Sequence, residues 1–277
     1  MFRYTIATFG RELLLLLVAL LWAIPFLLLV VISFKSDEEM ADSPMSLPAG
    51  IDLGNFVEVW EGGSRGGIGR ALVNSAVITG GSVLCLIVLG SVCAYVIARR
   101  EGRMSGLLYG LFVLGIILPF QLGIVPVYAI MRELDLAGTY PGMILLYTAL
   151  LMPMAVFLYT GFARALPRDY EEAAYVDGAS RLTTFVRVVF PLLRPITGTV
   201  AVLTGVMIWN DFFVQLIFLS GSTLQTIPVA VYSFVGEYVT RWNLIFAAVL
   251  ISILPVLVFY LFAQKQLIQG FTGGVKG

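Results

Sequence analysis

Six long apolar segments dominate this 277-residue sequence and restrict it to folds that can exist in a lipid bilayer. Each is close to or above the roughly 20 residues that an α-helix needs to cross a hydrocarbon core about 30 Å thick. Only 12% of the residues are charged and 59% are hydrophobic, whereas soluble domains carry about 25% charged residues. We therefore predict an all-α polytopic membrane protein with six transmembrane helices, near Leu13–Phe34, Ala71–Ala98, Gly106–Met131, Pro141–Gly161, Ile196–Leu219 and Leu244–Phe262.

Two prolines distinguish the third of these segments. Pro119 and Pro126 both fall within it, and each removes a backbone hydrogen-bond donor that a continuous helix needs. In a membrane this loss is tolerated where neighbouring protein groups or a water-lined cavity satisfy the freed carbonyl. We therefore expect this helix to be kinked or broken.

The basic residues of the connecting segments predict the orientation of the helices. Cytoplasmic loops of membrane proteins carry an excess of Lys and Arg. When the N-terminus is placed inside, the inner segments hold 12 basic residues and the outer segments hold 5. We expect both termini to be cytoplasmic and residues 1–277 to form one transmembrane domain, with a cytoplasmic loop at residues 163–195 between spans four and five.

This loop contains a short charged stretch, Glu171–Ser180, with the sequence EEAAYVDGAS. Asp169, three residues before Glu172, predicts a capping-box-like helix start, and Gly178 suits the left-handed residue just after a helix end. A helix of about two turns is marginal in water, because nucleation costs more than a few hydrogen bonds return. The stretch is therefore either a docking element or a helix lying on the lipid headgroups, and a second apolar helix is expected over Thr183–Val189.

The spacing of this stretch resembles the cytoplasmic signature of inner-membrane permeases of ATP-binding-cassette importers. That signature reads E-A-A, three residues, G, nine residues, I-x-L-P. Here Glu172-Ala173-Ala174 is followed after three residues by Gly178 and after nine more by Val188, with Phe190 and Pro191 completing the motif. Val replaces Ile and Phe replaces Leu, and both replacements stay apolar. The resemblance implies a short coupling helix that inserts into a groove on an ATPase subunit, formed by Glu171, Glu172, Ala173, Ala174, Asp177 and Gly178.

The resemblance covers nearly the whole chain and is strongest to the carbohydrate-uptake branch, the maltose-type second permease. It implies a second permease subunit in a heterodimer, two ATP-hydrolysing subunits and an extracytoplasmic solute-binding protein, in the inner membrane of a bacterial or archaeal cell. Lys plus Arg equal Asp plus Glu, 17 each, so we expect no nucleic-acid partner. The supporting motifs are Asn74-Ser75, Trp209-Asn210-Asp211, Gly236-Glu237-Tyr238 with Trp242, Gln269-Gly270-Phe271-Thr272 and Val275-Lys276-Gly277.

The chain lacks the residue types that most catalytic and metal sites require. It contains no histidine, which removes Ser-His and Cys-His dyads and the HExxH zinc motif. It contains no G-x-x-x-x-G-K-[ST] nucleotide-binding loop either. We therefore expect no catalytic, cofactor or metal site in this chain, and ATP and Mg to be bound by the separate ATPase subunit.

One carboxylate, Asp211, lies well inside the fifth predicted span. Charged groups in a membrane span are costly and indicate a functional site by default. Trp209 and Asn210 beside it offer an aromatic face and an amide, which suit a sugar, and Gln121 and Tyr128 are further polar candidates for the substrate pathway. The alternative is that Asp211 pairs within the helix bundle and orients helices without contacting solute. Tyr147 and Tyr159 are further polar-tipped candidates, and for these two as for Gln121 and Tyr128 we expect packing in the core with a satisfied polar tip rather than solute contact.

Three classes of function remain to be compared. A permease subunit that forms half of a carbohydrate pathway accounts for the signature, the orientation and the missing catalytic residues. The same kind of permease for a glycerol-phosphate-like solute is less favoured, because few basic residues face the predicted pathway. A secondary transporter accounts for the spans and Asp211 but leaves EEAAYVDG without a role, and an intramembrane enzyme has no acid–base pair.

Overall fold

The computed structural model describes residues 6–62, 66–235 and 241–273. Every regular element in these ranges is a helix or helical turn, and none is a strand, which confirms the all-α prediction. The chain divides into two compact units. Unit 1 lies within residues 1–70 and 230–256, and unit 2 lies within residues 71–229 and 257–277.

Several helices have the length and composition of membrane spans. Three qualify alone: Thr8–Ser33, Ile68–Arg99 and Tyr140–Ala165. Two bent pairs qualify when each is taken as one span: Arg103–Ile117 with Phe120–Glu133, bent by 92°, and Arg181–Leu192 with Arg194–Asn210, bent by 73°. The described part of the chain thus contains up to 5 spans by this criterion, which supports a multi-pass membrane protein.

The sixth predicted span, Leu244–Phe262, falls within α15 (Trp242–Gly273), which carries Pro255 inside it. Its apolar stretch Trp242–Val258 is shorter than the other candidate spans. The count of six therefore stays a prediction.

The expected break in the third span is confirmed. α6 (Arg103–Ile117) ends at Leu118, whose backbone is extended, and a 3₁₀ turn, η2 (Phe120–Gly123), leads into α7 (Ile124–Glu133). A residue that precedes a proline is pushed out of the helical region, which explains the end at Leu118. Pro126 lies in the first turn of α7, where a missing N–H has no helical partner to lose.

The fifth predicted span, Ile196–Leu219, is not one continuous helix, and that prediction is wrong. α12 (Arg194–Asn210) ends at Asp211, whose backbone is extended with φ −72° and ψ 125°, and a separate helix, α13 (Phe213–Phe218), follows. Oδ1 of Asp211 accepts a hydrogen bond from the Val214 amide at 3.3 Å, as the side chain of a helix cap does. The carboxylate therefore stabilises a break between helices and does not lie inside a helix.

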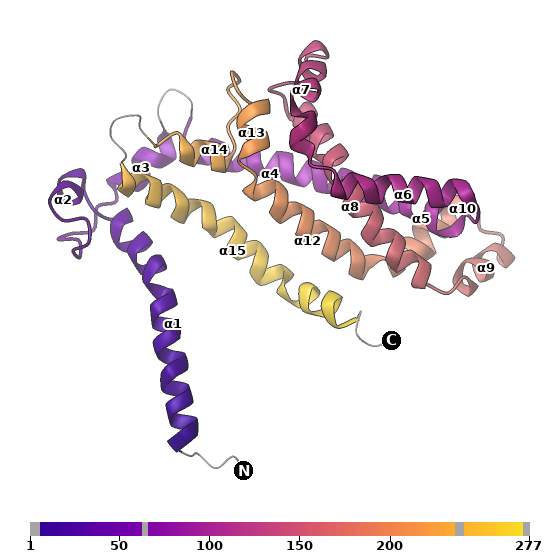
Figure 1. Cartoon of the computed structure of the whole chain (residues 1–277), viewed down its shortest axis with the longest axis horizontal. Coiled ribbons are helices and arrows are strands. Elements are labelled where there is room, and N and C mark those ends of the chain that lie inside the picture. The colour runs from indigo at the N-terminus through magenta and orange to yellow at the C-terminus, as the bar shows by residue number, and fades with distance from the viewer. Residues whose placement is uncertain (1–5, 63–65, 236–240, 274–277) are drawn as a thin grey trace. The chain divides into compact units, whose positions relative to one another are not determined.

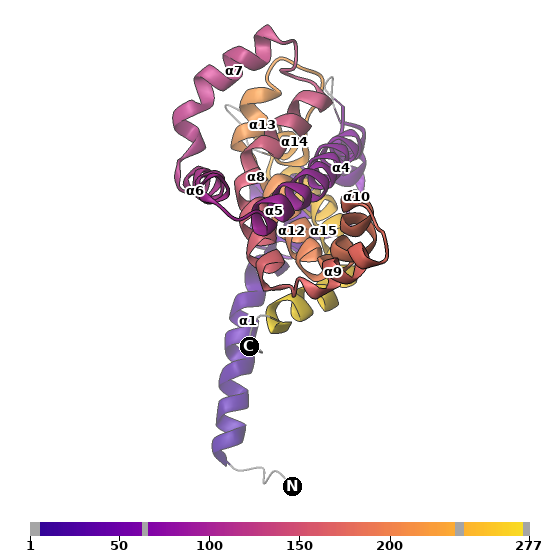
Figure 2. The same cartoon turned by 90° about the vertical axis from the view of Figure 1, so that its right-hand side faces the viewer.

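Unit 2 is built around α8 (Tyr140–Ala165), which packs against three other helices (Figures 1 and 2): α5 (Ser91–Arg99), α6 and α12. α4 (Ile68–Cys85) continues into α5 through a π-helical turn, η1 (Leu86–Gly90). Small residues permit close packing here, as is common between membrane helices. Ala155 of α8 is fully buried, and a Cβ at Gly90 would lie 3.1 Å from the Cβ of Ala155.

Unit 1 contains a long apolar helix and two short helices that follow it: α1 (Ile6–Ser33), α2 (Asp37–Asp42) and α3 (Gly54–Glu61). Lys35, between the first two, is fully buried. Its Nζ donates to the carbonyl of Ser43 at 2.6 Å and to Oγ of Ser46 at 3.0 Å. These bonds compensate for the removal of the ammonium group from water and hold the loop after α2 in place.

An ion-pair network also joins α2, α3 and the start of α15 within unit 1. Arg241 binds Asp37 at 2.7 Å and also pairs with Glu58. The hydrogen bond from Arg241 holds the pKa of Asp37 below its ordinary value. Asn243 donates to Asp37 at 2.9 Å and to Asn55 at 3.0 Å.

Candidate functional site

The charged stretch of the polar loop forms α9 (Asp169–Val176), a helix of 8 residues at the end of unit 2 (Figure 1). The predicted capping box is wrong. The N-cap is Arg168, which makes no side-chain capping bond, and Asp169 occupies the first helical position. The acidic residues of the first turn instead complement the positive end of the helix, a favourable placement that needs no capping bond.

The other end of α9 follows the prediction. Gly178 has a φ of +82°, in the left-handed region where a residue with a Cβ is strained. Its amide donates to the Tyr175 carbonyl at 3.0 Å, and the Ala179 amide donates to the Ala174 carbonyl at 2.9 Å. These two bonds form a Schellman motif, which satisfies carbonyls that the helix end would leave open.

One acidic residue of α9 points inward and attaches the helix to the rest of unit 2. Glu171 is 7% exposed. It accepts hydrogen bonds from Nε of Arg99 at 2.6 Å and from the Tyr95 hydroxyl at 2.8 Å. Arg99 also donates to the carbonyl of Leu166, in the connection between α8 and α9, at 3.1 Å. The end of α5 therefore holds both the short helix and the segment that leads into it.

The outer face of α9 is open to contact. Glu172, which the sequence pattern grouped with Glu171, lies on this exposed face. Val176 is 88% exposed, although it is apolar. Ala174 is half-buried, and the remaining predicted coupling residues are exposed: Ala173, Asp177 and Gly178. The face thus combines small side chains, carboxylates and an apolar group.

The helix after α9 is longer than the predicted Thr183–Val189. It runs from Arg181 to Leu192, with a π-helical turn, η3 (Phe185–Val189), between α10 (Arg181–Thr184) and α11 (Phe190–Leu192). α9 packs against α10 and η3. Because α11 leads into α12 at the 73° bend, α9 is connected to the bundle in two places, through Arg99 to α5 and through this helix to α12.

The predicted pathway residues around Asp211 lie at the break between α12 and α13. The Tyr147 hydroxyl, from α8, donates to Oδ2 of Asp211 at 2.7 Å, so both oxygens of the half-buried carboxylate have partners within unit 2. This is the geometry of the alternative interpretation, in which Asp211 orients helices. Trp209 is half-buried, and the exposed Asn210 donates to the carbonyl of Val206 at 2.9 Å.

The other two pathway candidates lie at or near the break in the third span. Gln121 is exposed in η2. Tyr128 of α7 is half-buried, and its ring meets that of Phe218 of α13 edge-on, with centroids 5.6 Å apart. Tyr128 also lines a cavity of about 360 Å³ together with Arg132 and Asp135. Tyr159, a further polar-tipped candidate, is fully buried and donates to Thr197 at 3.0 Å, as core packing with a satisfied tip requires.

Sequence reasoning missed one residue that organises this region. Gln215 is 1% exposed; its Nε2 donates to the Ile208 carbonyl at 2.8 Å, and its Oε1 accepts from the Thr226 hydroxyl. The Ile208 carbonyl lies in the last turn of α12, where helical partners run out, and it also accepts a long bond of 3.3 Å from the Asp211 amide. In the sequence, the only sign of this role was a single glutamine within an apolar run.

The structure describes some of the supporting sequence motifs and not others. Asn74 donates to the carbonyl of Gln225 at 2.7 Å, and Ser75 accepts from the Ile227 amide at 3.0 Å, so this motif holds the connection before α14 (Ile227–Tyr232). Trp242 begins α15. Two motif segments, 236–238 and 275–277, lie outside the described residues. Residues 269–272 belong to α15, but their side chains lie outside the described part of the structure. Within the described part of the chain, no three His, Cys, Asp or Glu side chains are grouped as metal ligands would be.

Comparison with known proteins assigns the chain to a family. Residues 86–272 match the family described as "Binding-protein-dependent transport system inner membrane component". The melibiose/raffinose/stachyose import permease protein MelC of Bacillus subtilis (strain 168) is 39% identical over 256 residues, which cover 92% of this chain and 91% of MelC. The multiple sugar-binding transport system permease protein MsmG of Streptococcus mutans is 33% identical over 270 residues, 96% of each chain.

A solved structure shares the fold. A chain of a bacterial ABC transporter involved in the import of the acidic polysaccharide alginate aligns with a TM-score of 0.78 and 20% identity, over 96% of this chain and 99% of that chain. At this identity the structural likeness shows the fold alone, whereas the family match and the identity to the sugar permeases show common descent. The chain belongs to the family of inner-membrane components of binding-protein-dependent transport systems, as an importer permease.

Proposed function

We propose that the chain is the permease subunit of an ATP-binding-cassette importer for a carbohydrate and forms half of its translocation pathway. The similar permeases MelC and MsmG are named for the import or transport of sugars, and they favour this solute over the glycerol-phosphate-like one that the sequence left open. A secondary transporter would not need the docking helix. The subunit itself is not an enzyme in this proposal; ATP and Mg bind to a separate ATPase.

The importer would contain a second permease, two ATP-hydrolysing subunits and an extracytoplasmic solute-binding protein. One related solved structure is that of a bacterial alginate ABC transporter in complex with an alginate pentasaccharide-bound periplasmic protein, with a TM-score of 0.65 to this chain. The excess of basic residues in the segments between alternate spans supports two cytoplasmic termini. In this proposal residues 1–277 form one transmembrane domain with six spans, and residues 163–195 form its coupling loop.

The two faces of α9 are the observation that most supports the coupling assignment. Glu171 is held inward by Arg99 and Tyr95, while Glu172 and Gly178 remain exposed on the other side. A helix of this length is marginal alone, yet here it is attached firmly on one side and open on the other. Such a helix can receive a push from a docked ATPase and pass it to α5 and α12.

The two helix breaks support the pathway assignment. Non-helical backbone at membrane depth is tolerated only where it is buried in protein or lines a water-filled cavity. The break at Pro119 carries Gln121, and the break after α12 carries Asp211. In our proposal the solute passes near these breaks and contacts some of Trp209, Asn210, Asp211, Gln121 and Tyr128, with Asp211 also fixing the break through Tyr147.

Two substitutions test the coupling assignment in the complete importer reconstituted in proteoliposomes. Glu172→Lys reverses an exposed charge on the docking face, and Gly178→Leu adds a bulky side chain where φ is +82°. We expect both to abolish solute-driven ATP hydrolysis and uptake while membrane insertion stays unchanged. The matched control is Glu133→Lys, the same charge reversal at an exposed residue at the end of α7. Wild-type uptake by the α9 variants would refute the coupling role.

A further inference from the structure

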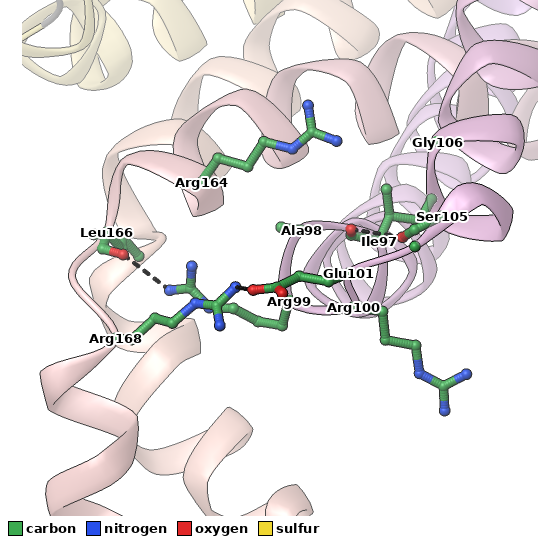
Figure 3. Close-up of a pocket in the computed structure, with 11 residues that line it drawn as sticks. Ile97, Ala98, Arg99, Arg100, Glu101, Ser105, Gly106, Arg164, Leu166 and Arg168 are labelled. Carbon is green, nitrogen blue, oxygen red and sulfur yellow. Dashed lines mark hydrogen bonds and ion pairs between the residues drawn. The ribbon is translucent and has the colours of Figure 1, made fainter.

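A basic cavity of about 420 Å³ lies in unit 2 where α5 ends and α6 begins (Figure 3). Four arginines and one carboxylate line it. They come from three elements: Arg99 and Arg100 from the end of α5 and the residue after it, Arg164 from the last turn of α8, and Arg168 from the connection to α9. The carboxylate is that of Glu101.

Two of the four positive charges are already neutralised. Arg99 pairs with Glu171 at 2.6 Å, and Arg168 pairs with Glu101 at 2.8 Å. In the part of the chain that the structure describes, no carboxylate pairs with Arg100 or Arg164. The Arg164 guanidinium lies over the Tyr109 ring, 4.7 Å from its centroid, which leaves its charge without a counter-ion. In Figure 3 Arg100 and Arg164 extend in different directions from the Arg168–Glu101 pair. The cavity therefore keeps an excess of two positive charges.

The backbone adds to this charge. α6 has 15 residues, and its N-cap is Gly102, with φ 128° and no side chain to bond the first amides. Gly102, Ser105 and Gly106 line the cavity. Ser105 does not serve these amides either, because its hydroxyl donates to the carbonyl of Ile97 at 2.8 Å. Unbonded amides at a helix N-terminus attract anions, and phosphate groups in particular.

The surroundings distinguish a lipid phosphate from a soluble one. The cavity lies at the ends of apolar helices with the composition of membrane spans, which is where lipid headgroups meet a protein. α6 also exposes apolar side chains at helical spacing, on the face turned away from Ser105 and Gly106: Met104, Leu107, Leu108 and Leu111. Such an exposed apolar surface suits contact with lipid acyl chains, so a phosphate group that reaches this end of α6 from the membrane would be that of a lipid.

We propose that the cavity binds a phosphate group, namely that of an anionic phospholipid, with Arg164, Arg100 and the first amides of α6 supplying the positive charge. Basic pockets between membrane helices on the cytoplasmic side are suited to such headgroups. The proposal goes beyond the import function and uses only the predicted orientation, in which this end of unit 2 faces the cytoplasm.

The test is native mass spectrometry of the full purified chain, titrated with phosphatidylglycerol and, separately, with phosphatidylcholine. We expect preferential binding of phosphatidylglycerol and a loss of about 25-fold in its affinity for Arg100→Ala/Arg164→Ala, because each basic residue near an anionic headgroup contributes about five-fold. The matched control, Arg181→Ala/Arg187→Ala, removes the same charge from exposed positions outside the cavity and should bind like the wild type. Equal affinities for all three proteins would overturn the proposal.

Two further arms make the test independent of folding and of the phosphate source. Arg100→Glu changes one exposed side chain only and should also weaken phosphatidylglycerol binding with an unchanged unfolding temperature; unchanged binding would count against the proposal. Inorganic phosphate alone should leave bound phosphatidylglycerol in place. Displacement of the lipid by inorganic phosphate, with matching protection of the wild type against unfolding, would show a soluble-anion site and refute the lipid assignment.

Discussion

Replacing Glu171 by alanine should detach α9 from the bundle without unfolding the spans. The carboxylate is the acceptor for Arg99 at 2.6 Å and for Tyr95 at 2.8 Å. The exposed fraction of the side chain is 13% for Arg99 and 9% for Glu171, so solvent screens the pair only weakly. The alanine variant would leave the Arg99 guanidinium with its bond to the Leu166 carbonyl but without a counter-charge.

The expected size of the effect follows from this burial. Removing one partner of a buried ion pair typically costs 3–5 kcal/mol, and we expect about 3 kcal/mol here, the lower end of that range, because Arg99 keeps one acceptor. Since each 1.4 kcal/mol is a factor of ten, the equilibrium between attached and detached α9 should shift by about 150-fold. Glu172→Ala, on the exposed side of the same helix, should change it by less than about 0.5 kcal/mol.

Hydrogen exchange measures this equilibrium directly. In Glu171→Ala the amides of residues 171–179 should lose protection by about two orders of magnitude, while those of α8 keep theirs. Glu171→Gln, which retains an acceptor for Tyr95, should fall between the alanine variant and the wild type. Wild-type protection of α9 in Glu171→Ala would refute the conclusion that this ion pair attaches the helix.

Three further predictions concern single residues. Gln215→Leu should lower stability by about 1–3 kcal/mol, because the buried Thr226 hydroxyl loses its acceptor and the Ile208 carbonyl keeps only the Asp211 amide as donor; an unchanged unfolding temperature would contradict this. Gly178→Ala should cost about 1–2 kcal/mol through its left-handed backbone, measured as faster exchange at the end of α9, and unchanged exchange would contradict it. Because Arg241 lowers the pKa of Asp37, the ionised carboxyl stabilises the fold above its unfolded-state pKa, and this contribution is lost as pH falls through the folded-state pKa. The unfolding temperatures of the wild type and Asp37→Asn should therefore differ at neutral pH and converge in acid, and a constant difference would contradict this.

Features that depend on local chemistry were predictable from the sequence. The apolar runs indicated the long helices, Pro119 indicated the break in the third span, and Gly178 indicated the end of α9. In each case a single residue type, or the length of an apolar run, determines the local backbone conformation. The resemblance in the coupling stretch likewise depends on a fixed spacing, and the family match over residues 86–272 agrees with it.

Features that depend on partners distant in the sequence were not predictable. The run around Asp211 is apolar enough to be taken for one helix, and its break is stabilised by Tyr147, 64 residues away in sequence, and by Gln215. Likewise, two adjacent glutamates look alike in EEAAYVDG, and only Arg99, 72 residues before Glu171, decides which of them points inward. Such choices are made by tertiary contacts that periodicity does not contain.

The central claim is that this chain moves solute only as part of an ATP-driven assembly. The most direct measurement is to tag the chain in its native membrane, purify it gently and identify by mass spectrometry the proteins that remain with it. Our account predicts a second multispan permease and an ATPase subunit, with solute uptake in proteoliposomes only when both are present and ATP is supplied. A purified chain that transports solute alone, without either partner, would contradict it.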